Sequence, residues 1–114
     1  MENSKDYLGK KVKVVMDRPY GSFHPKWGFK YETNYGYIPN TVSGDGEELD
    51  AYVLGVFEPL SEFEGEVIAI IKRDNQDDDK LIVVGDGANF SDEEINKQVD
   101  FQEKFFTHTI IRKW

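Results

Sequence analysis

Residues 44–54 (GDGEELDAYVL) carry several carboxylates at the point where a glycine-rich turn leads into a hydrophobic segment. Residues 49–56 are almost all apolar apart from Asp50, which predicts a strand buried on both faces. An ionised Asp50 there needs a cation or several hydrogen bonds as compensation. A divalent metal ion is the simplest such cation, because Mg²⁺ takes carboxylate, water and phosphate oxygens as ligands. The alternative is a tight Asp-Gly turn followed by one hydrogen-bonded Asp.

A second acidic segment, residues 73–80 (RDNQDDDK), connects two further predicted strands, 65–72 and 80–84. It holds four Asp within six positions, a pattern that on its own is typical of a solvent-exposed hairpin turn. Two acidic loops on one small sheet are harder to explain in this way. If both loops face the same end of the sheet, their carboxylates repel one another unless metal ions lie between them.

The remaining pattern predicts a small α+β fold. Additional strands are expected at 11–16 and 49–56, and two prolines with a glycine make 18–25 a loop. A helix is predicted from residue 92 to about 108, because Ser91 and Glu94 form a capping box ahead of an apolar face. About five strands with one C-terminal helix packed on them indicate an OB-like closed β-barrel.

Composition narrows the possible functions. The 114 residues are expected to form one domain, 1–114, and the net charge of −8 argues against a nucleic-acid partner. The chain has no cysteine, which excludes disulfides, thiolate catalysis and Cys-ligated zinc. Apolar runs such as 67–71 are too short to span a bilayer, and residues 1–11 are too polar for a signal peptide. We therefore expect a cytoplasmic protein with no membrane partner.

Residues 45–51 (DGEELDA) resemble the acidic signature of the soluble, Mg²⁺-dependent family I inorganic pyrophosphatases. Three more segments resemble this family in the same order along the chain: 16–19 (MDRP), 31–38 (YETNYGYI) and 74–80 (DNQDDDK). The resemblance implies that the chain hydrolyses inorganic pyrophosphate to two phosphates by direct attack of a metal-activated water. It also implies Mg²⁺ as the cofactor and favours a homo-oligomer.

The resemblance and the nearby cations together predict a role for each site residue. The expected metal ligands are Asp45, Asp50 and Asp78, with Asp74 and Asp17 completing a further site. The expected catalytic residues are Glu47, which orients or deprotonates the attacking water, with Tyr35 and Lys80. The expected substrate-binding residues are Arg18, Lys26, Lys30, Tyr31 and Lys80.

Four departures from the family pattern shape these expectations. Asp17 stands where the family has an early Glu as a metal ligand. Glu47 stands where the family has Asp, the segment 17–31 is shorter than in the family, and Thr109 with Ile110 stands where a phosphate-binding Tyr-Lys pair is usual. We expect the cations of the shortened segment to replace that pair. Two alternatives stay open: a hydrolase of a different diphosphate, such as a nucleotide, and a non-catalytic domain that binds divalent cations or phosphate.

The aromatic residues are numerous enough to suggest a base-stacking surface, with six Tyr and eight Phe. Such surfaces work beside a basic groove, which this acidic chain lacks. Five phenylalanines are therefore predicted to lie in the core or against the helix: Phe57, Phe63, Phe101, Phe105 and Phe106.

Overall fold

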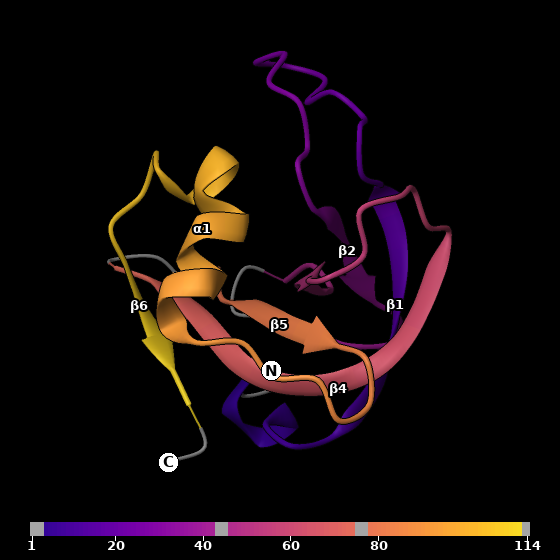
Figure 1. The fold of residues 1–114 in the computed structure, drawn as a ribbon, viewed down its shortest axis with the longest axis vertical. Helices are drawn as coiled ribbons and strands as arrows, with labels where there is room; N and C mark the ends of the chain where they lie inside the picture. The colour runs from indigo at the N-terminus through magenta and orange to yellow at the C-terminus, as the bar shows by residue number, and fades with distance from the viewer. Residues whose placement is uncertain (1–3, 43–45, 75–77, 113–114) are drawn as a thin grey trace.

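The computed structural model describes residues 4–42, 46–74 and 78–112. Its elements are η1 (Ser4–Tyr7), β1 (Lys11–Arg18), β2 (Asn34–Ile38), β3 (Leu49–Val53), β4 (Glu62–Arg73), β5 (Lys80–Val84), α1 (Asp92–Glu103) and β6 (His108–Ile111). Figure 1 shows the strands wrapped around a common centre, with α1 lying against one side of them.

The first five strands close into a barrel. They follow one another in the order β1-β2-β3-β5-β4, and β4 also pairs with β1. Strands β3 and β5 are parallel, whereas the other neighbouring pairs are antiparallel. The closure depends on the length of β4, which pairs with β1 through its first part and with β5 through its second. The predicted OB-like barrel with one helix packed on it is confirmed.

The predicted strands agree with the observed ones to within a few residues, but two strands, β2 and β6, were not predicted. Strand β5 matches the prediction 80–84, whereas β3 ends at Val53 instead of Val56. Strand β2, which has Gly36 at its centre, was recognised only as part of a family motif. A Cβ atom at Gly36 would lie 2.0 Å from the carbonyl oxygen of Val15 on β1. Glycine is therefore needed there for close strand packing, not for a turn.

The prediction that the helix reaches residue 108 was wrong. Its start is confirmed, since the Ser91 hydroxyl accepts from the Glu94 amide and the Glu94 side chain accepts from the Ser91 amide. The helix, however, ends at Glu103, and the chain returns as β6 along the outer edge of β4. Thr109 and Ile110 lie in this strand. Both residues are β-branched, and such side chains favour a strand over a helix.

Two apolar clusters hold the fold together. One fills the barrel and includes Val53, Ile70 and Leu81, and the other lies between the barrel and α1, where Tyr52 and Val99 meet. Successive residues of β3 thus enter different clusters, which confirms that this strand is buried on both faces. No helix in the described part of the chain is long and apolar enough to cross a membrane.

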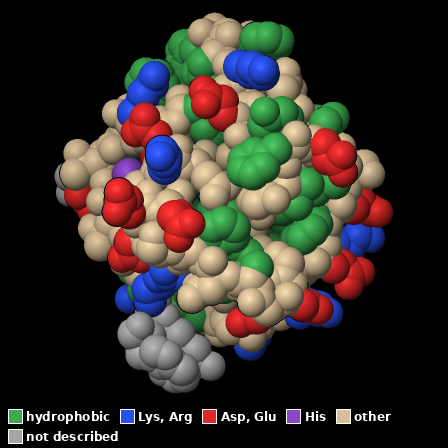
Figure 2. Space-filling view, in the orientation of Figure 1, with side chains coloured by type: hydrophobic (Ala, Val, Ile, Leu, Met, Phe, Trp, Pro, Cys, Tyr) green, Lys and Arg blue, Asp and Glu red, His purple; other side chains and the backbone are tan. Residues whose placement is uncertain are grey.

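The five phenylalanines predicted to be packed have different environments. Phe101 is buried in the core, and Phe63 and Phe106 are partly buried. Phe57 and Phe105 remain 61% and 60% exposed, so the prediction was wrong for these two. On the face drawn in Figure 2, hydrophobic side chains reach the surface next to Asp, Glu, Lys and Arg.

Candidate active site

Side chains from all five barrel strands meet in one cavity of about 440 Å³, which we call the cleft. Its charged end is formed by Asp17, Arg18, Asp50, Arg73, Asp78 and Lys80. The pairing of β3 with β5 explains why this end is charged. Asp50 is the direct register partner of Lys80 on the neighbouring parallel strand, so both side chains start from adjacent positions.

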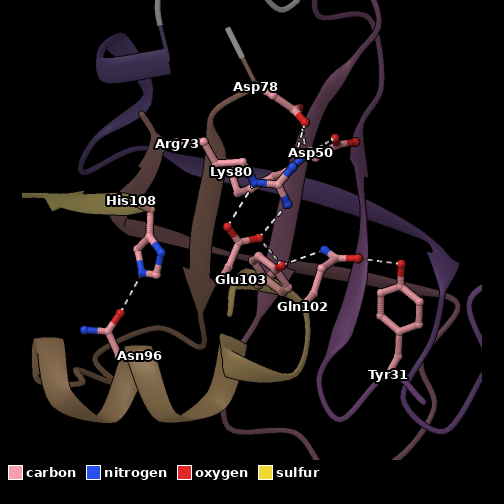
Figure 3. A network of polar contacts seen from close by, with 10 residues as sticks. Tyr31, Asp50, Arg73, Asp78, Lys80, Asn96, Gln102, Glu103 and His108 are labelled. Atoms are coloured by element: carbon pink, nitrogen blue, oxygen red, sulfur yellow. Dashed lines mark hydrogen bonds and ion pairs between the residues drawn. The ribbon is translucent and has the colours of Figure 1, made fainter. Parts of the chain in front are cut away.

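Lys80 lies at the centre of the charged end and is only 2% exposed. Its Nζ atom donates to Oδ2 of Asp50 at 2.6 Å and to Oδ1 of Asp78 at 2.7 Å (Figure 3). A buried ammonium needs such partners, and so does a carboxylate in an apolar strand. The cation that Asp50 was predicted to need is therefore supplied in this structure by a lysine.

Asp78 is held on its other side by a second buried cation. Arg73 Nη1 donates to Oδ2 of Asp78 at 2.9 Å, and Arg73 Nε and Nη2 donate to the two carboxylate oxygens of Glu103 at 3.0 and 2.7 Å. Burial alone would raise the pKa of Glu103, but the hydrogen bonds from Arg73 and Tyr52 outweigh it and hold that pKa below its usual value. Glu103 therefore stays ionised although it is fully buried.

Further hydrogen bonds continue from Glu103 to the opposite wall of the cleft. The Tyr52 hydroxyl donates to Glu103 at 2.5 Å, the Gln102 amide donates to the Tyr52 hydroxyl at 2.6 Å, and the Tyr31 hydroxyl donates to Gln102 at 2.7 Å (Figure 3). Burial raises the pKa of Tyr31 to about 12. Tyr31, predicted to bind substrate, thus lines the cleft while its hydroxyl supports α1.

Sequence reasoning did not assign a site role to Arg73, Gln102 or Glu103. One usable signal was present: Glu103 follows Ile95 and Val99 at intervals of four residues, which places a carboxylate on the apolar face of the helix. A carboxylate at such a position requires a buried cation. Nothing in the local sequence identifies Arg73 as that cation, because the two residues are 30 positions apart.

A second cavity of about 460 Å³ adjoins the charged end and is mainly acidic. Its lining consists of Asp17, Tyr37, Glu47, Glu48, Asp50 and Asp78. Burial raises the pKa of Asp17, nearby Arg18 opposes this, and the charge of Asp50 adds to the rise. Oxygen donors of this kind suit a hard divalent cation.

The predicted metal ligands are only partly brought together. Asp17, Asp50 and Asp78 line both cavities, whereas Asp74 lines neither, and Asp45 lies outside the described residues. Within residues 4–42, 46–74 and 78–112, no three His, Asp or Glu side chains are grouped closely enough to hold a metal ion. The donor chemistry fits a divalent cation, with Lys80 currently bound to two of the carboxylates.

The three cations predicted to bind substrate in the segment 17–31 do not all line the cleft. Arg18 lines the cleft, but Lys26 and Lys30 do not. Lys26 Nζ lies 5.4 Å from the ring centroid of Trp27, and Lys30 Nζ lies 5.9 Å from that of Tyr20. Of the basic residues predicted to hold substrate oxygens, only Arg18 and Lys80 line the cleft.

Tyr35 lies in the cleft beside Lys80, whose Nζ is 5.6 Å from the ring centroid. Burial, followed by the nearby charge of Asp50, raises the pKa of Tyr35 well above its usual value. Its hydroxyl is therefore protonated at neutral pH and can donate a hydrogen bond. A cleft with buried cations, a protonated phenol and several carboxylates is typical of a site that binds phosphate together with a divalent cation.

The fold and the cleft thus define an OB-like barrel with an acidic, lysine-containing site at one end. A family model described as inorganic pyrophosphatase matches residues 6–114. The chain belongs to the inorganic pyrophosphatase family.

Curated relatives agree with this assignment, and a solved structure agrees with the fold. The chain is 33% identical over 94 residues to an inorganic pyrophosphatase of Haemophilus influenzae, covering 64% of this chain and 53% of the relative. It is 34% identical over 100 residues to one of Neisseria meningitidis, covering 69% and 56%. The chain thus spans about half the length of the curated relatives it matches. The Thermus thermophilus inorganic pyrophosphatase structure has a TM-score of 0.68 at 19% identity, covering 98% of this chain and 86% of that one.

Proposed function

We propose that this protein hydrolyses inorganic pyrophosphate to two phosphates in a reaction that depends on a divalent metal, Mg²⁺. The observation that carries the proposal is the pairing of the buried Lys80 with the partly buried Asp50 and Asp78 in a chain of the inorganic pyrophosphatase family. The matched relatives bear the name of this activity but are about twice as long as the matched part, so the activity of this shorter chain needs its own test.

Asp17, Asp50 and Asp78 are the described residues best placed to hold the metal. Asp45, which lies outside the described residues, stays a prediction as a metal ligand. When bound, Mg²⁺ lowers the pKa of a water ligand and neutralises charge on the phosphoryl group. The Lys80 ammonium forms ion pairs with both Asp50 and Asp78. If Asp50 and Asp78 held the metal, the ammonium would be available to a phosphate oxygen. Asp74 stays a prediction as a further ligand.

The other predicted residues take roles that their positions support. Glu47 lines the acidic cavity with Asp50 and would accept the proton of the attacking water. The water oxygen bonds to one phosphorus as the bond from that phosphorus to the bridging oxygen breaks, and the bridging oxygen leaves on the second phosphate. Arg18 and Lys80 would hold the equatorial oxygens, and the Tyr35 hydroxyl would donate to one of them.

Phosphate release from pyrophosphate tests this proposal, measured with excess Mg²⁺ and again with EDTA. We expect turnover only with the metal, and a large loss of kcat in Glu47→Gln with Mg²⁺ binding retained. Glu93→Gln makes the same change at an exposed position of α1 and should behave like the wild type. Mg²⁺ binding without any phosphate release would contradict the proposal and favour the non-catalytic alternative.

We also propose a homo-oligomer in the cytoplasm, as the family resemblance and the sequence composition favour. Light scattering on the purified protein tests the first point and cell fractionation the second. The absence of nucleic-acid and membrane partners stays a prediction from the net charge of −8 and the short apolar runs.

A further inference from the structure

The cleft has a second end that is aromatic instead of charged. The cavity that contains Asp50, Asp78 and Lys80 is also lined by Trp27, Phe29, Phe105 and Phe106. The same four rings form an adjoining apolar recess of about 420 Å³. Figure 1 shows that the β1–β2 connection, which supplies Trp27 and Phe29, lies at the same end of the molecule as the α1–β6 connection, which supplies Phe105 and Phe106.

Two of the four rings are exposed, although their surroundings fix their positions, and Phe29 and Phe106 are partly buried. The side chain of Trp27 is 65% exposed, and that of Phe105 is 60% exposed. Trp27 stacks on His24 with ring centroids 4.7 Å apart and an interplanar angle of 18°. The ring centroids of Phe29 and Phe105 are 5.8 Å apart, so these two rings connect the two walls of the recess. Exposed apolar surface of this kind commonly marks a binding site.

A hydrogen-bonded turn holds Trp27 in place. The amides of Lys26 and Trp27 both donate to Nδ1 of His24 at 3.1 Å, and the His24 amide donates to the Phe29 carbonyl at 2.8 Å. Because Nδ1 accepts these bonds, the neutral imidazole carries its proton on Nε2. Burial, then Arg18 and Lys26, lower the pKa of His24, so the ring is neutral at pH 7. The cleft therefore has a neutral hydrogen-bond donor beside its aromatic end.

Inorganic pyrophosphate uses none of this surface, because the ion has only charged and polar oxygens. A planar aromatic base on a phosphate chain would use both ends of the cleft. We propose that the cleft binds nucleoside diphosphates, with the phosphates at Lys80 and the base stacked on Trp27 and Phe105. This proposal rests on the proposed function, since it places the phosphates in the same charged end. The net charge of −8 disfavours a nucleic-acid strand as the ligand.

Hydrolysis of such a ligand follows the same course as that of pyrophosphate. The water oxygen bonds to the terminal phosphorus, and the bond from that phosphorus to the bridging oxygen breaks. The bridging oxygen leaves on the nucleoside monophosphate, and the proton of the water passes to Glu47, the base that we propose above. No additional reactant is needed.

Calorimetric titration with two non-hydrolysable probes tests the aromatic subsite without relying on turnover. The probes are α,β-methylene-ADP and methylenediphosphonate, both measured with excess Mg²⁺. We expect the wild type to bind the adenosine probe at least about tenfold more tightly, since a base stacked on aromatic rings adds affinity of this order. Trp27→Ala and Phe105→Ala should each lose most of that advantage and bind methylenediphosphonate within about twofold of wild type.

Two further variants serve as controls. Phe57→Ala removes a ring that is 61% exposed but lies outside the cleft, so both affinities should stay unchanged. Trp27→Phe keeps a flat ring and should retain most of the preference for the adenosine probe. Light scattering measures the oligomeric state of each variant.

Three results would overturn the subsite: equal wild-type affinity for the two probes, equal weakening of both probes by Trp27→Ala, or a change of oligomeric state in that variant without a change in base preference. The last result would make the aromatic patch a contact between copies of the chain. If pyrophosphate turnover persists without a base preference, the subsite alone is wrong. If the base preference persists without pyrophosphate turnover, the proposed substrate alone is wrong.

Discussion

The buried Lys80 ammonium compensates two carboxylates of this acidic cleft. One buried ammonium is shared by two carboxylates, and Arg73 adds a second positive charge at Asp78. Removing either cation leaves a partly buried carboxylate without compensation, which is costly. If Lys80 binds phosphate as we propose, another cation has to hold Asp50 and Asp78. At the residue scale, the proposal therefore links the phosphate role of Lys80 to metal binding.

The positions of the cations lead to a prediction about Arg18. Arg18→Ala should raise the KM for pyrophosphate by about one to two orders of magnitude, because a charge-assisted contact to phosphate contributes roughly 1.5 to 3 kcal/mol. Lys30→Ala should change KM far less, since Lys30 does not line the cleft. Steady-state kinetics on both variants measures the difference.

Arg112→Ala is the control for this comparison. Arg112 bonds to Asp92 and to the Phe90 carbonyl, outside the residues that line the cleft, so its loss should affect stability instead of KM. A larger rise in KM for Arg112→Ala than for Arg18→Ala would mean that the C-terminal segment supplies the phosphate contact.

At the scale of elements, α1 is fixed to the barrel by a polar network as well as by apolar packing. Glu103 ends the helix and binds Arg73 at the end of β4, while Gln102 reaches Tyr31 in the β1–β2 connection. The network ties the helix to both walls of the cleft. Changes at the helix end should therefore affect the stability of the fold and the geometry of Asp78 together.

Glu103 gives a pH-dependent prediction. Because its folded-state pKa is lowered, its contribution to stability is fully present above the unfolded-state pKa of about 4.3 and is lost as the pH falls through the lower folded-state value. Glu103→Gln should cost up to about 3–5 kcal/mol at pH 7, and the gap to wild type should narrow at pH 3. Urea unfolding at both pH values measures this, with Glu93→Gln as an exposed control. An equal gap at both pH values would contradict it.

The start of α1 gives a smaller, independent prediction. Ser91→Ala removes the hydroxyl that accepts from the Glu94 amide, so it should lower the free energy of unfolding by about 0.5–2 kcal/mol. Ser22→Ala, in the β1–β2 connection, is a comparison that leaves the helix intact. Urea unfolding of the two variants decides the point, and equal stability of Ser91→Ala and wild type would show that the cap contributes nothing.

The sequence predicted elements well where local pattern decides them, and poorly where distant pairing does. Strand β5 and the start of α1 follow from apolar runs and a capping box. Strand β2 and the end of the helix depend on partners: Gly36 is selected by the backbone of β1, and β6 forms because β4 offers an open edge. The acidic residues of the cleft were found from motif spacing. The aromatic end was not, because Trp27 and Phe105 are far apart in sequence.

For the whole molecule, the proposed metal site predicts stabilisation by divalent cations. A ligand that binds only the folded state adds about 2.7 kcal/mol at a hundred times its Kd, which raises Tm by several degrees. Differential scanning fluorimetry in Mg²⁺ and in EDTA measures this effect. Asp86→Asn, which changes an exposed acid paired with Lys11, should keep the full shift. Identical melting curves in Mg²⁺ and EDTA would count against the site.

The most direct test of the proposed function is pyrophosphate turnover in Asp50→Asn. This substitution keeps the side-chain volume and removes the charge that would ligate the metal. With Mg²⁺ in excess, we predict that kcat falls by several orders of magnitude, that circular dichroism shows an intact fold, and that Asp86→Asn retains wild-type kcat. Near-full turnover in Asp50→Asn would contradict the assignment of this cleft as a metal-dependent pyrophosphatase site.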